Sequence, residues 1–90
     1  MLEKIKLRCG IAKQVTVYDE EISGYIEDAR ADLIASGVPP DQVDAPDEQI
    51  VTAVTLYVKA HIGDDRSDTG VYMDMYRKKV FRLALVPEEE

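Results

Sequence analysis

The 90-residue sequence contains a single cysteine, no asparagine and no long apolar run. One cysteine cannot form a disulfide within the chain, and proteins of reducing, intracellular compartments are those that usually lack disulfides. Without asparagine there is no acceptor for N-linked glycans. No apolar stretch approaches the roughly 20 residues that span a bilayer, and four charges within residues 1–10 argue against a signal peptide. We therefore expect a small cytosolic protein that does not enter a membrane.

Residues that perform catalysis or bind metals are also scarce. Cys9 and His61 are the only residues of their types, and neither has a catalytic partner nearby in the sequence. We expect Cys9 to be a small buried apolar residue, and His61 to contact the carbonyl groups at the end of a helix. Residues 64–70 lack the ligand spacing of an EF-hand, and the glycines are too scattered for a phosphate loop. We expect no enzymatic activity, cofactor or metal; a hydrolase using Cys9 and His61 is the alternative.

Hydrophobic periodicity predicts an all-α fold, a small bundle of about four helices with a short N-terminal helix and three longer ones. The helices are expected at residues 2–9, 17–36, 47–62 and 69–85. Gly10 and Gly37 are expected to end the first two, while Thr16 and Asp68 are expected to cap the second and fourth. The prolines and aspartates of residues 38–46 predict a loop, as does the polar segment 63–70. We expect one domain over residues 1–86 and a frayed acidic tail over residues 87–90.

The predicted third helix is apolar around nearly its whole circumference, and such a helix is normally buried on several sides. Three other short helices offer little chain to bury it, so we expect neighbouring subunits to cover part of it. The alternative is simple packing in the core of one chain. The predicted fourth helix carries a basic run that we expect to be a solvated helix face, with docking to another subunit or partner and contact with nucleic acid as the alternatives. The candidate subunit or partner interface therefore comprises Ile50, Val54, Tyr57, Val58, Arg77, Lys78 and Arg82.

Charge is segregated along the chain, whose formal net charge is −7. Residues 1–13 sum to +3, residues 18–48 to −9 and residues 77–82 to +4. Two explanations are open. The basic segments could pack beside the acidic helix of the same molecule, or the acidic face of one copy could meet the basic face of the next. The overall sign argues against a domain that grips nucleic acid with its whole surface.

The order of these segments resembles the head–tail connector (DNA-packaging adaptor) proteins of tailed phages and prophages. The likeness covers about residues 2–85 and rests on the short first helix, the segment 16–22 and the amphipathic run 26–33. It continues through the hydrophobic segment 50–63 and a last helix that contains Tyr76 and Arg77. It is a pattern of helices and spacings and includes no catalytic signature.

The resemblance implies a structural, non-enzymatic protein that forms a homo-oligomeric ring and docks on the portal protein. The ring would extend the DNA channel and present a surface to the next neck or tail-completion protein, with DNA passing through without specific binding. It also implies a location in the virion neck, and in the host cytoplasm during assembly. The alternative is a small helical regulatory or antitoxin-like module that binds one protein partner through the helix from Ile50 to Ile62.

Overall fold

The computed structural model describes residues 1–62 and 66–85, with side chains described for residues 1–62 and 70–85. These residues form five α-helices and no strand, which confirms the predicted all-α class. The helices are α1 (Leu2–Arg8), α2 (Asp19–Ala35), α3 (Pro40–Asp44), α4 (Glu48–Ile62) and α5 (Arg66–Ala84). None of them is long and apolar enough to cross a bilayer. The predicted tail, residues 87–90, lies outside the described residues.

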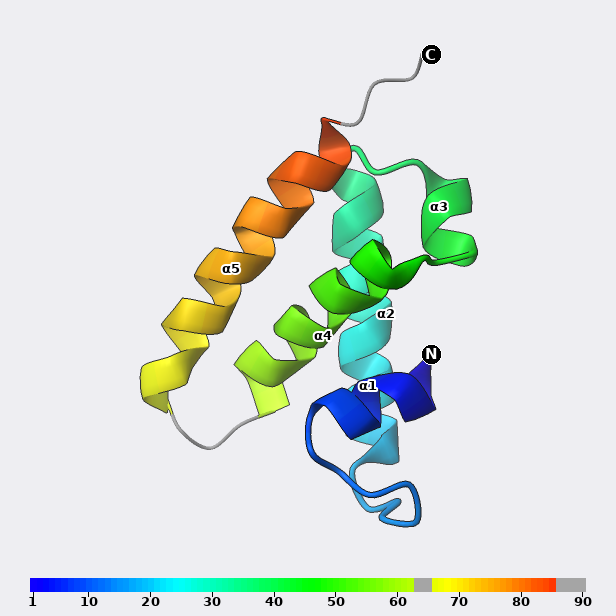
Figure 1. Ribbon diagram of the computed structural model, residues 1–90, viewed down its shortest axis with the longest axis vertical. Coiled ribbons are helices and arrows are strands. Elements are labelled where there is room, and N and C mark those ends of the chain that lie inside the picture. Colours follow the sequence, from blue (N-terminus) through cyan, green and yellow to red (C-terminus); the bar gives the residue numbers. More distant parts are fainter. Residues whose placement is uncertain (63–65, 86–90) are drawn as a thin grey trace.

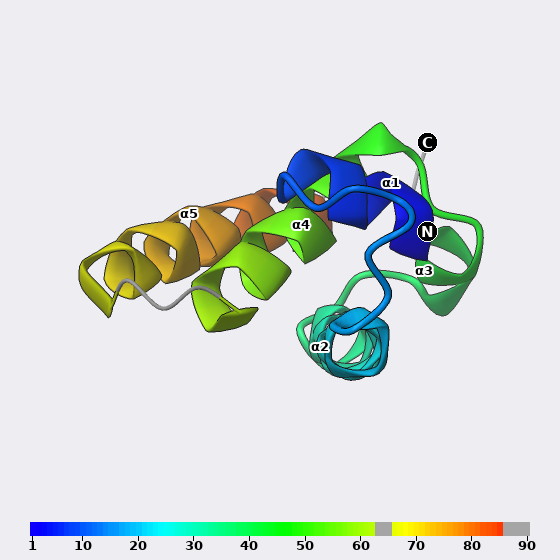
Figure 2. The ribbon, with the colours of Figure 1, turned by 90° about the horizontal axis from the view of Figure 1, so that it is seen from below.

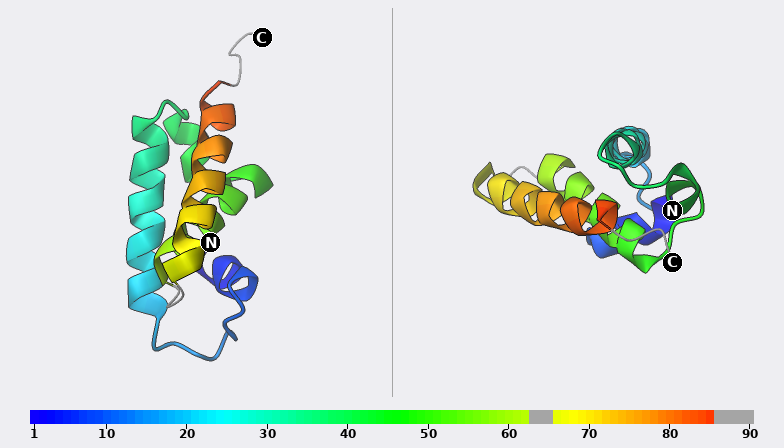
Figure 3. Two further views of the ribbon diagram at one scale, coloured as in Figure 1. Left: turned by 90° about the vertical axis from the view of Figure 1, so that its left-hand side faces the viewer. Right: turned by 90° about the horizontal axis from the view of Figure 1, so that it is seen from above.

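Helix α4 lies at the centre of the molecule and contacts α1, α2 and α5 (Figure 1). Helices α1, α4 and α5 form a row, and α2, seen end-on, lies on one side of that row (Figure 2). The short α3 packs on α2. In the side view α2 stands beside α5, which lies in front of α4, and the view from above again shows α2 apart from the row (Figure 3). The result is a molecule with two faces, one formed by the row and the other by α2.

The helix ends follow local chemistry, with one exception. Gly10 and Gly37 have φ of 79° and 111°, the left-handed conformation that favours glycine, and each follows a helix as predicted. Asp47 caps α4, because its Oδ1 accepts a hydrogen bond from the Ile50 amide at 3.0 Å. The prediction that Thr16 caps α2 was wrong: α2 begins after Tyr18, which makes no side-chain cap. The acidic residues of its first turn stabilise that end through the helix dipole instead.

Two segments predicted as loops are partly helical. Pro40 occupies the first turn of α3, where a residue without an amide hydrogen costs nothing, and Val43 anchors α3 with 0% of its surface exposed. Residues 66–70, predicted as the end of a polar loop, form the start of α5, so residue 68 lies inside the helix rather than capping it. The first four residues of α5 are all polar, so hydrophobic periodicity could not reveal them. Residues 63–65 lie outside the described residues.

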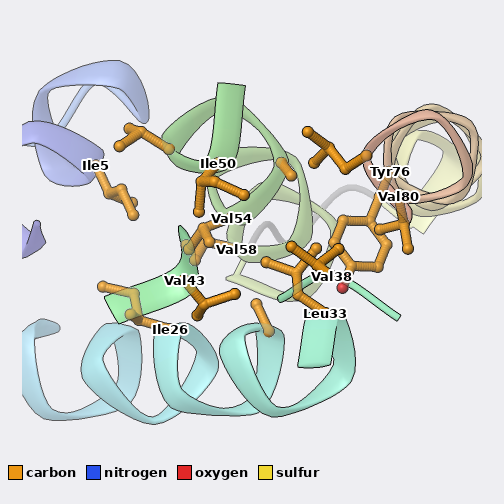
Figure 4. Packing of buried hydrophobic residues seen from close by; sticks show 14 of the residues in the cluster. Ile5, Ile26, Leu33, Val38, Val43, Ile50, Val54, Val58, Tyr76 and Val80 are labelled. Atoms are coloured by element: carbon orange, nitrogen blue, oxygen red, sulfur yellow. The ribbon is translucent and has the colours of Figure 1, made fainter. Parts of the chain in front are cut away.

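The hydrophobic core is built around α4. Ile50, Val54 and Val58 are each at most 1% exposed. Figure 4 shows them between the residues of α2 and those of α5, where Tyr76 and Val80 close the other side. The prediction that neighbouring subunits cover α4 was therefore wrong for these residues, whereas Leu56 on the same helix stays partly exposed. A helix flanked by α1, α2 and α5 can be apolar on most sides and still be covered within one chain.

Candidate interaction surfaces

A groove of about 530 Å³ separates α2 from α5. Its lining includes Asp32 from α2, Tyr57 from α4 and Tyr76 from α5. Tyr76 donates a hydrogen bond from Oη to Asp32 Oδ2 at 2.7 Å. Burial of the phenol raises the pKa of Tyr76 far above its ordinary value, and the bond to the Asp32 carboxylate raises it further. Tyr76 therefore stays protonated and joins the two helices across the groove.

His61 belongs to an aromatic cluster near this groove. Its ring stacks on Tyr57 with a centroid separation of 4.2 Å and lies 5.3 Å from the ring of Tyr25. Its Nδ1 is 2.7 Å from the Tyr57 carbonyl oxygen, which can only accept a hydrogen, so this nitrogen carries the proton. His61 thus has a structural role in the last turn of α4, although the carbonyl that it contacts belongs to the preceding turn and is not at the helix end.

Cys9 has the environment of a packing residue. It is partly buried against the core, and burial raises the pKa of its thiol, an effect that the nearby charge of Lys59 only partly offsets. A thiol that remains protonated is a poor nucleophile. Among the described residues, no hydrogen bond joins Cys9 to His61. The arrangement therefore gives no support to the hydrolase alternative.

The row of α1, α4 and α5 carries a basic surface, which we call the basic face. A shallow hollow of about 380 Å³ marks its centre between α4 and α5. Arg8 of α1 borders it by donating a hydrogen bond to Thr52 Oγ1 at 3.2 Å. Lys79 lies 3.5 Å from Gln49 Oε1 on α4. The basic face comprises Arg8, Thr52, Leu56, Met75, Lys78, Lys79 and Arg82.

Two carboxylates lie next to the basic face. Glu48 pairs with Lys4 at 2.8 Å and also with Arg8, and these two hydrogen-bonded cations lower the pKa of Glu48. Asp74 pairs with Lys78 at 3.2 Å within α5. In the part of the chain with described side chains, Lys79 and Arg82 form no ion pair. The basic face consequently keeps an excess of positive charge.

Helix α2 carries the opposite surface, which we call the acidic face: Glu20, Glu27, Asp28, Ala31 and Ile34. The helix contains six acidic residues and one basic residue, Arg30. Arg30 pairs with Glu27 at 3.3 Å and with Asp44 at 3.1 Å. Glu20 and Asp28 are exposed and form no ion pair with any residue whose side chain is described.

The N-terminal end of α2 has one ion pair with the basic N-terminal segment of the chain. Lys6 pairs there with Asp19 at 2.7 Å, which neutralises part of the negative charge of the first turn. The basic N-terminal segment thus reaches α2, but no ion pair among the described side chains joins α2 to α5.

The seven residues predicted for an interface are divided among three places. Ile50, Val54 and Val58 are in the core and cannot reach another molecule while the chain keeps this conformation. Tyr57 and Arg77 line the groove between α2 and α5. Lys78 and Arg82 belong to the basic face.

Sequence reasoning missed the apolar members of the basic face, Leu56 and Met75. Met75 precedes Lys78 by three residues and Arg82 by seven, so helical spacing could have placed it beside them. Nothing in the sequence could have placed Leu56 there, because this depends on which side of α4 faces α5.

The described residues define a small all-helical protein whose distinctive features are two surfaces of opposite charge. The chain belongs to the phage connector protein family, whose family model matches residues 1–90. This confirms the resemblance inferred from the helix pattern. No curated protein and no solved structure matches the chain significantly. Family membership gives the protein a structural role as a phage connector and implies a place at the neck of the virion.

Proposed function

We propose that the chain is a non-enzymatic subunit of a homo-oligomeric head–tail connector ring that docks on the portal protein and extends the DNA channel. The ring presents its far side to the next neck or tail-completion protein. Subunits assemble in the host cytoplasm and remain in the virion neck. The observation that carries the proposal is the pair of oppositely charged faces on one small molecule, which allows each copy to bind two others.

The net charge of −7 supports a channel through which DNA passes without specific binding. A surface of the same sign as phosphate repels the duplex, which keeps it from adhering to the wall. The basic residues on α5 do not contradict this, since contact with another protein would remove them from the channel.

The alternative of a regulatory module that binds one protein partner has less support. It requires the helix from Ile50 to Ile62 to offer its apolar side to the partner, and that side is in the core of the single chain. Membership of the connector family also favours the ring.

Mixing the purified chain with portal assemblies of the same phage tests the proposal. Native mass spectrometry and electron microscopy would measure how many chains bind and whether they form a closed ring. We expect a complex with many copies of the chain per portal. A chain that stays monomeric over a wide concentration range, and that also fails to bind the portal, would contradict the proposal. A stable complex with one copy of another protein would instead support the regulatory alternative.

A further inference from the structure

We propose that the basic face of one copy binds the acidic face of the next copy, so that α5 and α4 of one subunit pack against α2 of its neighbour. This inference rests on the proposed function and specifies which surfaces join the subunits. It assigns a partner to two faces for which the described residues provide none.

The position of the two faces supports a head-to-tail contact. The basic face lies on the row formed by α1, α4 and α5, whereas α2 runs along another side of that row (Figures 2 and 3). A contact between two different surfaces of identical molecules leaves one free surface of each kind, so further copies can add until the ring closes. A contact of the basic face with another basic face would bring like charges together.

The charges of the two faces are complementary. Residues 70–85 contain four basic residues and one acidic residue, a net of +3, while α2 contains six acidic residues and one basic residue, a net of −5. Most of these side chains are exposed: 77% of the Lys78 side chain and 71% of the Glu27 side chain are accessible. The ion pairs of Lys78 and Glu27 within their own helices join residues three or four positions apart and are exposed, so they hold the side chains only weakly. Opposite charges on two copies would attract each other and set the register of the contact.

Each face also has an apolar centre. Met75 is 47% exposed and lies with Leu56 in the hollow of the basic face. Ile34 is 41% exposed on α2, and Ala31 is exposed three residues before it. Apolar surface removed from water stabilises a contact, and a polar rim around it is typical of protein interfaces. These centres favour a protein partner over DNA, whose phosphates would gain nothing from Leu56 and Met75.

Charge reversal on each face, separately and together, tests this contact. One variant is Lys78→Glu/Arg82→Glu, the second is Glu20→Lys/Glu27→Lys, and the third combines all four changes in one chain. Matched controls change the net charge by the same amount at exposed residues outside both faces, through Ala12→Glu/Lys13→Glu/Gln14→Glu and Glu3→Lys/Asp41→Lys. Circular dichroism would establish that each variant is folded. Light scattering, with portal where assembly requires it, would measure the concentration at half-assembly.

We expect each single-face variant to need about tenfold more protein for half-assembly, or not to assemble, because it brings like charges into contact. The four-change variant should recover assembly, and so should an equal mixture of the two single-face variants. Both controls should behave as the unchanged chain does. Recovery by the four-change variant is a result that mere destabilisation could not produce.

Several outcomes would overturn the inference, and they can be told apart. If the unchanged chain never assembles, with or without portal, the proposed function fails together with this contact. If it assembles and the folded single-face variants assemble equally well, the ring stands but its subunits are joined elsewhere. If Lys78→Glu/Arg82→Glu abolishes binding to duplex DNA while leaving assembly unchanged, the basic face is a DNA contact instead.

Discussion

Tyr76 of α5 donates a hydrogen bond to Asp32 of α2 at 2.7 Å. The phenol is 2% exposed, whereas Asp32 lies at the surface. The bond therefore connects the inner side of α5 to the exposed edge of α2. It holds the basic and acidic faces in a fixed relation, which a subunit that contacts two neighbours requires.

Replacement of Tyr76 by phenylalanine should lower the free energy of unfolding by about 1.5–3 kcal/mol, since a hydrogen bond to a charged group contributes about that much. Urea unfolding followed by circular dichroism measures it. The control is Tyr18→Phe, because Tyr18 is 45% exposed and its hydroxyl forms no hydrogen bond with the described residues. Equal stability of the Tyr76→Phe variant and the unchanged chain would contradict the structural role of the bond.

The contribution of Tyr76 should depend on pH at the alkaline end. Its pKa is raised in the folded state by burial and by Asp32, so folding favours the protonated phenol. The stabilisation is fully present below about pH 10, the ordinary tyrosine pKa, and decreases as pH rises above it. The difference in unfolding free energy between the unchanged chain and Tyr76→Phe, measured from pH 7 to pH 11, isolates this effect from other titrating groups. A difference that stays constant to pH 11 would contradict it.

Lys6 should contribute more to stability than an ordinary surface lysine. Its side chain is 2% exposed, and its Nζ lies 2.7 Å from Asp19 Oδ1 and 3.1 Å from the Lys13 carbonyl oxygen. Apart from that ion pair, Asp19 Oδ1 is buried with no hydrogen-bond partner among the described residues. Lys6→Met leaves this oxygen without a partner and should cost about 2–3 kcal/mol in urea unfolding. We expect no larger loss of unfolding free energy, because Asp19 is 31% exposed and keeps some contact with water.

Lys4→Met is the matched control for Lys6→Met. Lys4 pairs with Glu48 at 2.8 Å, but both side chains are more than half exposed. An exposed pair of this kind is screened by water and contributes little to stability, so Lys4→Met should lower the unfolding free energy far less than Lys6→Met does. If the two variants lose equal stability, the burial of Lys6 has no energetic consequence and the account of α1 is wrong.

Truncation of Ile50 should destabilise the single chain itself. Ile50 is 1% exposed in the core, so Ile50→Ala removes buried methylene groups and leaves a cavity, at a cost of about 2–4 kcal/mol. Met75→Ala, at a residue 47% exposed on the basic face, should cost less than about 1 kcal/mol yet weaken assembly. Unfolding of dilute protein and light scattering at high concentration separate the two effects. If Ile50→Ala instead left stability unchanged and weakened assembly, Ile50 would face another subunit, as predicted from the sequence.

The sequence was most informative where one local signal decides the structure. Gly37 ended α2 because it adopts a positive φ, and the spacing of Tyr76 and Val80 identified the inner side of α5. It was least informative where tertiary packing decides. The burial of Val54 depends on three helices that surround α4, and α3 exists because Val43 finds a place in the core. The grouping of the basic residues on one side of α5 could be predicted from their helical spacing. The apolar hollow between α4 and α5 could not, because it depends on how these two helices pack.

The most direct measurement of the account is disulfide cross-linking between copies in a Cys9→Ser background. One variant carries Glu27→Cys on α2, another carries Lys78→Cys on α5, and a third carries both. We predict that oxidation of the variant with both cysteines gives a ladder of covalent multimers. A mixture of the two single-cysteine variants should stop at dimers, and neither alone should cross-link. Rings that form normally without any ladder, or dimers from either single-cysteine variant alone, would contradict the contact between the basic and acidic faces.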